Sequence, residues 1–354
     1  MVADRQGRVI GSIAVLRPGL QTTIQDRGRW GLQSSGVPVA GPMDPWSHRL
    51  ANLLVGNSAD AATLEVTLIG PELQFDDDRW VAVVGATFDI ALDDRPVIGG
   101  HPWRVGAGSR LRMGKRSRGA RAYLAVGGGI DVPLVLGSRA THVASGLGGY
   151  EGRALITGDR LRLGVAPGDN DATDGIAERR LRLAERMTTM SLRESTGVQG
   201  VWRWGPSSGT AGGVPGGTSR VRVLPGPQRD RFDAEALDQL QSAPYRVAQD
   251  SNRMGFRLEG PALGHVDDRE MLSDATPHGV VQVPRSGQPI LLMADHQTTG
   301  GYPKIATMIS ADAGVAGQLA PGDFLQFEIC DERTALAELH RLERAFRELE
   351  SLVS

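Results

Sequence analysis

The sequence contains a single cysteine and only two lysines, Lys115 and Lys304. Because Cys330 has no partner, an internal disulfide framework is excluded, which favours a reducing compartment. The 39 basic and 41 acidic side chains give a net charge of −2, so no basic excess is present for binding nucleic acid. No apolar run approaches the ~18 residues of a membrane span, and the N-terminus lacks a signal-peptide core. We therefore expect a cytoplasmic protein without a membrane segment.

Several signatures of catalysis are also missing. The seven histidines form no HxH or HExxH pair, so the sequence predicts no metal site. The GKR at 114–116 lacks the upstream glycine and the Ser/Thr of a P-loop, and the GGG at 127–129 does not fit GxGxxG. No G-x-S-x-G elbow occurs. Cys330 follows an apolar run beside an acid, which favours structural burial over a role as nucleophile.

Glycine is abundant, with 47 residues, and short β-branched runs recur between turn residues. Runs such as "WVAVVGA", "RAYLAVGGGI", "GVVQVP" and "PILLMAD" predict strands joined by turns. Helical spacing occurs in three places, around 44–56, at 233–241 and in the C-terminal 334–353. The sequence therefore predicts a mainly β protein with a few short helices.

The first predicted helix has clear start and stop signals. Asp44 is placed to cap it, Pro45 occupies the first helical position, and Gly56 can end it. An apolar stripe lies on one face, which places His48 and Asn52, four residues apart, on the other. His48 is then either part of a binding site or a solvated helix residue.

An internal repeat indicates two related β units. Three short motifs recur in the same order, which favours a duplicated barrel because closure removes exposed strand edges. The pairs are "VLRPGLQ" (15–21) with "VLPGPQ" (223–228), "IGPEL" (69–73) with "EGPAL" (259–263), and "GDRLRLG" (158–164) with "GDFLQFE" (322–328).

The predicted domains follow from this repeat. The first β unit spans 12–168 and the second spans 219–330, followed by a C-terminal helix at 331–354. The intervening 169–218 ends in a stretch rich in glycine, serine and proline, which is typical of a flexible linker. Its "VWRWG" could instead dock on a neighbouring surface.

The segment "ADHQTTGGYPKIATMI" (294–309) carries the densest set of reactive side chains. Its two glycines permit close approach of a ligand to the backbone, and its lysine suits a carboxylate or a phosphate. The alternative is a tight turn whose polar atoms bond only to local backbone. The candidates for catalysis are Asp295, Tyr302 and Lys304, and those for binding are His296, Gln297, Thr298, Thr299, Gly300 and Gly301.

Two other segments are candidate walls of the same site. In "QDSNRMGFRLEG" (249–260), Asn252 precedes Arg253, whose guanidinium can hold an anion in bidentate geometry or pair with an acid. In 31–52, a polar loop leads into the first helix, where a helix N-terminus attracts anions. The binding candidates of this loop and helix are Gln33, Asp44, His48 and Asn52. We expect the three segments to face one cleft.

Together these motifs resemble the family of the 5-oxoprolinase C subunit, which is also described as allophanate hydrolase subunit 2 or biotin-dependent carboxyltransferase. The family includes an antagonist of a sporulation kinase inhibitor and the carboxyltransferase region of urea carboxylase. The resemblance covers roughly 13–168 and 219–328. It runs through "PGLQTTIQDRGRWG", "GVPVAGPMD", "GLGGYEGRAL", "SNRMGFRLEGP", "QVPRSGQPILLMADHQTTGGYPKIA" and "LAPGDFLQF".

The resemblance implies two tandem cyclophilin-like β-barrels. It also implies two partners, a homologue of the 5-oxoprolinase B subunit (allophanate hydrolase subunit 1-like) and the A subunit. The implied activity is an ATP-dependent 5-oxoprolinase that opens 5-oxo-L-proline to L-glutamate and is active only in the complex. Lys304, Arg253 and the glycine backbone would then hold phosphate or carboxylate, while Gln297, Thr298 and Thr299 orient the ring.

Two alternatives stay open within the resemblance. The same pocket could take carboxybiotin from a separate carrier and pass carbon dioxide to urea or a related amide. Neither lysine lies in a biotinylation context, so this chain does not carry biotin itself. The third possibility is a non-enzymatic regulator that binds a homologue of the B subunit.

Overall fold

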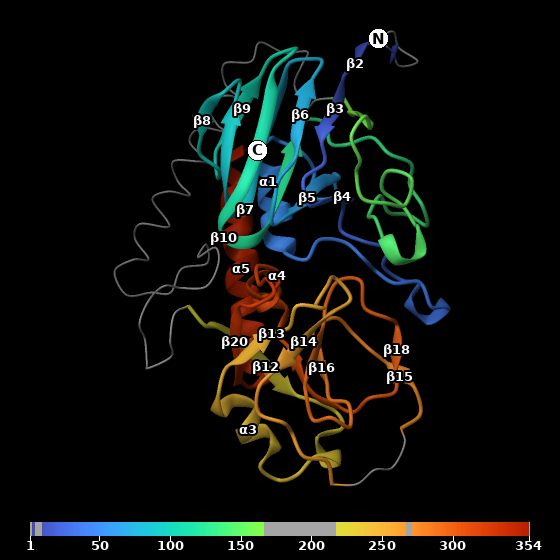
Figure 1. Ribbon diagram of the computed structural model, residues 1–354, viewed down its shortest axis with the longest axis vertical. Coiled ribbons are helices and arrows are strands. Elements are labelled where there is room, and N and C mark those ends of the chain that lie inside the picture. Colours follow the sequence, from blue (N-terminus) through green and yellow to red (C-terminus); the bar gives the residue numbers. More distant parts are fainter. Residues whose placement is uncertain (1, 4–8, 166–216, 267–270, 354) are drawn as a thin grey trace. The chain divides into compact units, whose positions relative to one another are not determined.

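The computed structural model describes residues 2–3, 9–165, 217–266 and 271–353 (Figure 1). All but the last two residues of the predicted linker at 169–218 lie outside the described residues. The described chain forms two compact units. Neither α5 (Glu332–Val353), the longest helix, nor any other helix in these ranges combines the length and apolar character needed to cross a membrane.

Membership of the two units does not follow chain order. The first unit contains residues up to 28, then 45–165, and the chain from 344 onward. The second unit contains 217–343 together with the early segment Arg29–Asp44. From the sequence, this early segment was expected in the first unit. In the structure Met43 lies instead in the hydrophobic core of the second unit, so the segment is part of that unit's packing.

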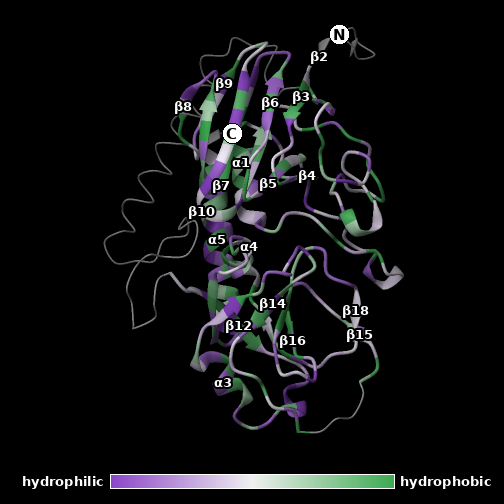
Figure 2. Cartoon of the chain, viewed as in Figure 1, coloured by the Kyte–Doolittle hydropathy of each residue, from purple (hydrophilic) through white to green (hydrophobic). Residues whose placement is uncertain are grey.

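The first unit is built on a nine-stranded sheet in the order β11-β3-β6-β10-β5-β4, with β7 pairing β10, β8 and β9. Figure 2 shows alternating hydrophilic and hydrophobic bands along the long strands, as expected for a pleated sheet. The strands are β3 (Ser12–Arg17), β4 (Gln21–Gln25), β5 (Thr63–Thr67), β6 (Glu72–Phe75), β7 (Arg79–Leu92), β8 (Arg95–Val97), β9 (Pro102–Val105), β10 (Arg110–Val126) and β11 (Arg160–Arg162). A separate pair joins β1 (Val2–Ala3) and β2 (Val9–Ile10), and η2 (Val143–Ser145) lies between β10 and β11.

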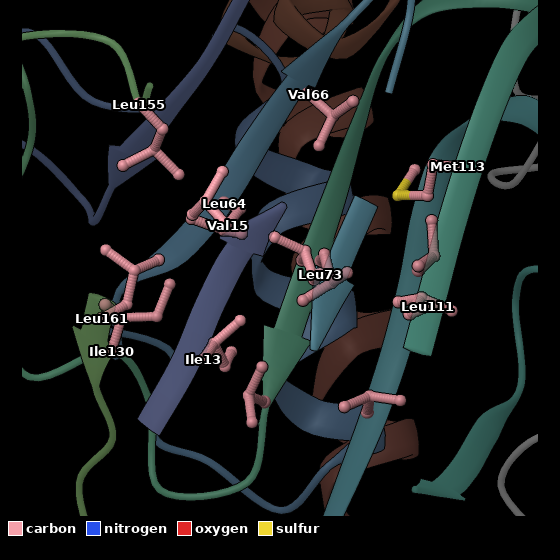
Figure 3. Close-up of a cluster of buried hydrophobic side chains, with 14 of the residues drawn as sticks. Ile13, Val15, Leu64, Val66, Leu73, Leu111, Met113, Ile130, Leu155 and Leu161 are labelled. Carbon is pink, nitrogen blue, oxygen red and sulfur yellow. The ribbon is translucent and has the colours of Figure 1, made fainter. Parts of the chain in front are cut away.

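Both faces of this sheet are covered by apolar side chains. One face carries a core whose members include Ile13, Leu73 and Leu111 (Figure 3). The other face packs against α1 (Pro45–Leu54) and the C-terminal end of α5, where Phe346 is fully buried. This double coverage explains why every residue of β5 is buried.

The second unit is a closed seven-stranded barrel in the order β12-β19-β16-β17-β14-β13-β20. Its core is filled by side chains from all seven strands, because each strand turns alternate residues inward. The strands are β12 (Ser219–Pro225), β13 (Tyr245–Val247), β14 (Gly255–Glu259), β16 (Val280–Gln282), β17 (Ile290–Leu292), β19 (Lys304–Met308) and β20 (Phe324–Ile329). Around them lie η1 (Gln33–Ser35), η4 (Arg229–Arg231), α3 (Ala236–Ser242), η5 (Ser310–Asp312) and α4 (Ala313–Gly317).

The mainly β fold class predicted from the sequence is confirmed. In each unit, the strand of the third repeated motif pairs with the strand of the first motif. These strands are β11 and β3 in the first unit, and β20 and β12 in the second. The pairing of β11 with β3 is antiparallel, whereas β20 pairs with β12 in parallel. The repeated motifs therefore occupy similar places in two units whose strand pairing differs in detail.

The helix signals in the sequence were largely correct. The first helix starts at Pro45, and Gly56 adopts the left-handed conformation (φ 74°) typical of a residue just past a helix end. The short second helix and the C-terminal helix are also present. The five-residue α4 was missed because its sequence, AGVAG, lacks helical spacing of large apolar residues.

Replacing Phe346 with alanine tests the packing of α5 in the first unit. The ring of Phe346 is fully buried, stacks on Trp46 at a centroid distance of 5.6 Å, and lies under the Arg49 guanidinium. We expect the first unit to lose about 3–5 kcal/mol of unfolding free energy, measured by urea denaturation. The exposed Arg347→Ala on the same helix should change it by less than about 0.5 kcal/mol. Equal effects of the two variants would contradict this packing.

Candidate functional site

A short two-stranded ladder in the second unit carries four of the polar side chains predicted for the site, His296, Gln297, Thr298 and Thr299. It consists of β15 (Asp274–Ala275) and β18 (Thr299–Gly300), which pair antiparallel (Figure 1). Thr276 continues the ladder, because its N–H donates to the Thr298 carbonyl at 3.0 Å and its hydroxyl donates to the Gln297 carbonyl. Residues 274–278 and 296–300 are called the polar ladder below.

Lys304, at the start of β19, is bound to one end of the polar ladder. Its side chain is buried, and its ammonium donates a hydrogen bond to Asp274, whose side chain is 56% exposed. This hydrogen bond and the lysine charge hold the pKa of Asp274 below its usual value. The Lys304 N–H donates to Gln228 Oε1 at 3.2 Å. A buried ammonium thus meets one accessible carboxylate.

Gly300 lies where several polar groups converge. A Cβ at this position would stand 2.6 Å from Gln282 Nε2 and 3.3 Å from Gln297 Nε2, so no larger residue fits without displacing them. Gln282 is buried opposite Lys304 at a β-bulge. Within the described residues its side chain makes one hydrogen bond, a long one of 3.4 Å from Nε2 to the Tyr302 carbonyl. That bond leaves the amide oxygen without a hydrogen bond among the described residues.

Arg253 and Asp295 form a buried bidentate ion pair. Arg253 Nε and Nη2 donate to the two carboxylate oxygens at 2.9 and 2.8 Å, and both side chains are about 6% exposed. Nη2 also donates to the Gly41 carbonyl at 2.7 Å. Of the two roles left open by the sequence, the structure supports pairing with an acid. Asp295, expected to be catalytic, is the counter-ion of this guanidinium.

The imidazoles of His278 and His296 face each other, with ring centroids 6.2 Å apart. His296 is buried, and its Nδ1 lies 2.8 Å from the Gln297 carbonyl. Burial lowers the pKa of His296, against the opposing effects of that carbonyl and of Asp295. Burial, followed by the charge of His296, lowers the pKa of His278 to about 4. Both rings are therefore neutral at pH 7.

The other predicted residues of the 294–309 segment line the outer part of the polar ladder. Thr299, Gly301 and Tyr302 are exposed, and Thr298 is half-buried. The Tyr302 side chain is accessible, with residue 302 at 47% exposure.

Three further candidates make local contacts in the second unit. Gln33 Oε1 accepts from the Gly31 N–H at 2.8 Å, and Asn252 Oδ1 accepts from the Met254 N–H at 2.8 Å. Asp44 is fully buried and accepts from Gln318 Nε2 at 2.8 Å. Each of these contacts stabilises a turn or a packed segment.

His48 and Asn52 lie in the first unit and are buried, so the solvated face expected for His48 is wrong. His48 Nδ1 lies 2.9 Å from Thr63 Oγ1, and Asn52 Nδ2 donates to the Ala61 carbonyl at 2.8 Å. Burial lowers the pKa of His48 to about 4. The sequence pattern failed here because α1 is covered on its polar face as well as on its apolar face.

Sequence reasoning missed five residues around the polar ladder. The signal for Gln282 was present, since it is the one polar side chain in the apolar strand "GVVQVP". Asp274, Thr276 and His278 occur together in "DATPHG" just before that strand, and Gln228 ends the repeated motif "VLPGPQ". Their convergence depends on strand pairing between distant segments, which spacing alone does not reveal.

Metal and thiol chemistry receive no support from the geometry. Within the described ranges, no cluster of three or more histidine, cysteine or acidic side chains could hold a metal ion. Cys330 is partly buried, and burial raises the pKa of its thiol, which disfavours the reactive thiolate.

Comparison with known proteins decides the family. Residues 35–329 match the family described as "Carboxyltransferase domain, subdomain A and B". The chain belongs to this family. It is 40% identical to the C subunit of 5-oxoprolinase from Escherichia coli, over 95% of this chain and 97% of that protein.

Members of the family also occur inside much longer proteins. The chain is 34% identical to urea amidolyase of Lachancea kluyveri, over 88% of this chain but 16% of that protein. The crystal structure of Kluyveromyces lactis urea carboxylase matches with a TM-score of 0.80 and 29% identity, over 97% of this chain and 30% of that chain. The fold is therefore shared between a free-standing protein and a segment of a large enzyme.

The buried neutral His48 predicts a loss of stability in acid. Its pKa is about 4 in the folded state and about 6.5 in the unfolded chain, so between these two pH values the unfolded chain binds the proton and the folded protein does not. The free energy of unfolding therefore has its full value above pH 6.5 and falls by about 3 kcal/mol as the pH reaches 4. Urea denaturation at several pH values measures it. His48→Gln should weaken this pH dependence, and an unchanged dependence would contradict the assignment.

The buried ion pair makes Asp295→Asn a strongly destabilising change. It leaves the Arg253 charge buried without a counter-ion, which costs about 3–5 kcal/mol in urea denaturation. Asp250→Asn is the matched control, since Asp250 pairs with Arg257 at 2.9 Å between exposed side chains and should cost less than about 1 kcal/mol. An Asp295→Asn protein of unchanged stability that lacks activity would return Asp295 to a catalytic role.

Proposed function

We propose that this chain is the C subunit of a 5-oxoprolinase, which works with A and B subunits to convert 5-oxo-L-proline to L-glutamate at the expense of ATP. The observation that carries the proposal is the end-to-end match to a separate C subunit, 97% of its length at 40% identity. The urea amidolyase match covers a small part of a much longer protein. We place the complex in the cytoplasm, consistent with the single cysteine.

The polar ladder has groups complementary to 5-oxo-L-proline, which carries a carboxylate, an amide N–H and an amide carbonyl. Lys304 is the proposed anchor for the carboxylate, which would replace Asp274 at the ammonium. The free amide oxygen of Gln282 can accept the ring N–H. The hydroxyls of Thr298 and Thr299 and the Gln297 amide would orient the ring, and Gly300 keeps the space open.

The described residues fit one carboxylate better than a triphosphate. Arg253 is committed to Asp295 and Gly41, so Lys304 is the one cation at the polar ladder. We therefore place ATP elsewhere in the assembled complex, where it supplies the free energy of an uphill ring opening. This chain then contributes binding and orientation of the substrate, and Tyr302 is an accessible phenol at the edge of the site.

A second candidate is carboxyl transfer from carboxybiotin to urea or a related amide. It is favoured by the structural likeness to urea carboxylase over 97% of this chain. The same donors would stabilise negative charge on the oxygen of the ureido group. A separate carrier protein would have to supply the biotin.

The decisive assay combines this chain with its A and B subunits, 5-oxo-L-proline and ATP, and follows glutamate and ADP. Glutamate that forms only when all components are present supports the proposal. A stable complex that forms no glutamate would contradict it. Carboxyl transfer from carboxybiotin to urea would be tested next.

Lys304→Met tests the carboxylate anchor in the assembled complex. Methionine keeps the apolar stem but removes the charge, so glutamate formation should fall at least about 100-fold while the complex still assembles. Asp274 is exposed, so its lost partner should cost little stability. The exposed Lys115→Met, which replaces the one other lysine, is the matched control and should keep full activity. Full activity of Lys304→Met would remove Lys304 from the site.

A further inference from the structure

His278 is half-buried in the polar ladder and has no role in the substrate contacts proposed above. Among the described residues, neither of its ring nitrogens takes part in a hydrogen bond, and its one ring contact is with His296. A ring whose nitrogens are both unsatisfied beside a ligand site can exchange a proton with a ligand or a water.

The strand register explains why the two histidines meet. Asp274 pairs with Gly300 and Ala275 with Thr299 in the polar ladder. The Thr276 N–H donates to the Thr298 carbonyl, which continues the same register. Two further steps along each chain, past Pro277 and Gln297, bring His278 opposite His296. The ladder thus carries the ammonium of Lys304 at one end and two imidazoles at the other.

His296 is held in one tautomer. Its Nδ1 contacts a carbonyl oxygen, which can only accept, so the ring proton lies on Nδ1 and the lone pair on Nε2. The Gln297 carbonyl is fixed in turn by the Thr276 hydroxyl. The ring of His296 therefore has a set orientation and one basic nitrogen.

Burial keeps both rings neutral. The one charged neighbour that favours protonation of His296 is Asp295, and its carboxylate is paired with Arg253. For His278, the charge of His296 adds to the effect of burial, and both oppose protonation of the His278 ring. Two neutral rings this close can accept one proton between them, since a second would be repelled.

We propose that His278 is the proton acceptor of this site and that His296 is its positioning partner. The inference rests on the proposed function. In ring opening, the water oxygen bonds to the lactam carbonyl carbon, one water O–H bond breaks, and the proton passes to His278. The carbon–nitrogen bond then breaks, and the His278 imidazolium gives that proton to the ring nitrogen. The imidazole finishes neutral, so all protons balance.

The kinetic test uses the complete complex with the A and B subunits. His278→Ala should lower kcat for glutamate formation about 100-fold or more, with KM for 5-oxo-L-proline changed less than about threefold. Added imidazole should restore part of the activity of His278→Ala, because a free base can enter the vacated space. The exposed His340→Gln is the matched control and should keep wild-type kcat. Wild-type kcat in His278→Ala, or a loss that imidazole does not restore in a folded complex, would overturn the inference.

A second test does not depend on activity. Ring-nitrogen NMR of the full chain, with labelled histidine, should show His296 protonated on Nδ1 alone and His278 neutral at pH 6. His296→Asn should raise the pKa of His278, since it removes the neighbouring imidazole whose protonated form repels a proton on His278. A His278 that is protonated at pH 6 would overturn the inference. A wild-type complex that forms no glutamate would overturn the proposed function instead, and these spectra would then decide whether the pair exists.

Discussion

The buried ion pair between Arg253 and Asp295 is the interaction on which the second unit depends. It joins the segment before β14 to the start of the 295–304 segment, and its spare donor binds the Gly41 carbonyl of 29–44. Ala40 and Gly41 both adopt positive φ (56° and 87°) where this carbonyl is presented, a strained conformation for alanine that the guanidinium contact offsets. Three chain segments far apart in sequence are thereby fixed around one charge pair, and the polar ladder starts one residue after Asp295.

This arrangement separates the side chains that hold the structure from those that meet a ligand. Arg253, Asp295 and Asp44 are buried and bonded to the protein, so their charges are already committed. At the polar ladder and beside it, by contrast, Asp274 and Tyr302 are accessible, and the Gln282 amide oxygen has no hydrogen bond among the described residues. A ligand would exchange contacts at the ladder without disturbing the buried pair. The ion pair therefore supports the site rather than forming its reactive part.

Much of the fold could be predicted from sequence because strand and helix signals are local. Pro45 and Gly56 mark the ends of α1, and the repeated motifs mark two β units. The placement of 29–44 could not be predicted, since it depends on packing of Met43 and on hydrogen bonds from distant residues, Arg253 to Gly41 and Gln318 to Asp44. The 294–309 segment was found by its density of polar groups, but Gln282 and His278 join it only through strand pairing. His48 and Asn52 were misjudged because helical spacing does not reveal whether a polar face is covered.

The central claim is that the polar ladder, with Lys304 as its anchor, holds the substrate. A crystal structure of the assembled complex with 5-oxo-L-proline tests it most directly. The account predicts the substrate carboxylate within hydrogen-bond distance of Lys304 Nζ, Asp274 displaced from that ammonium, and the lactam ring against Gly300 and Gln282. Substrate bound elsewhere, with the hydrogen bond between Lys304 and Asp274 intact, would contradict the account.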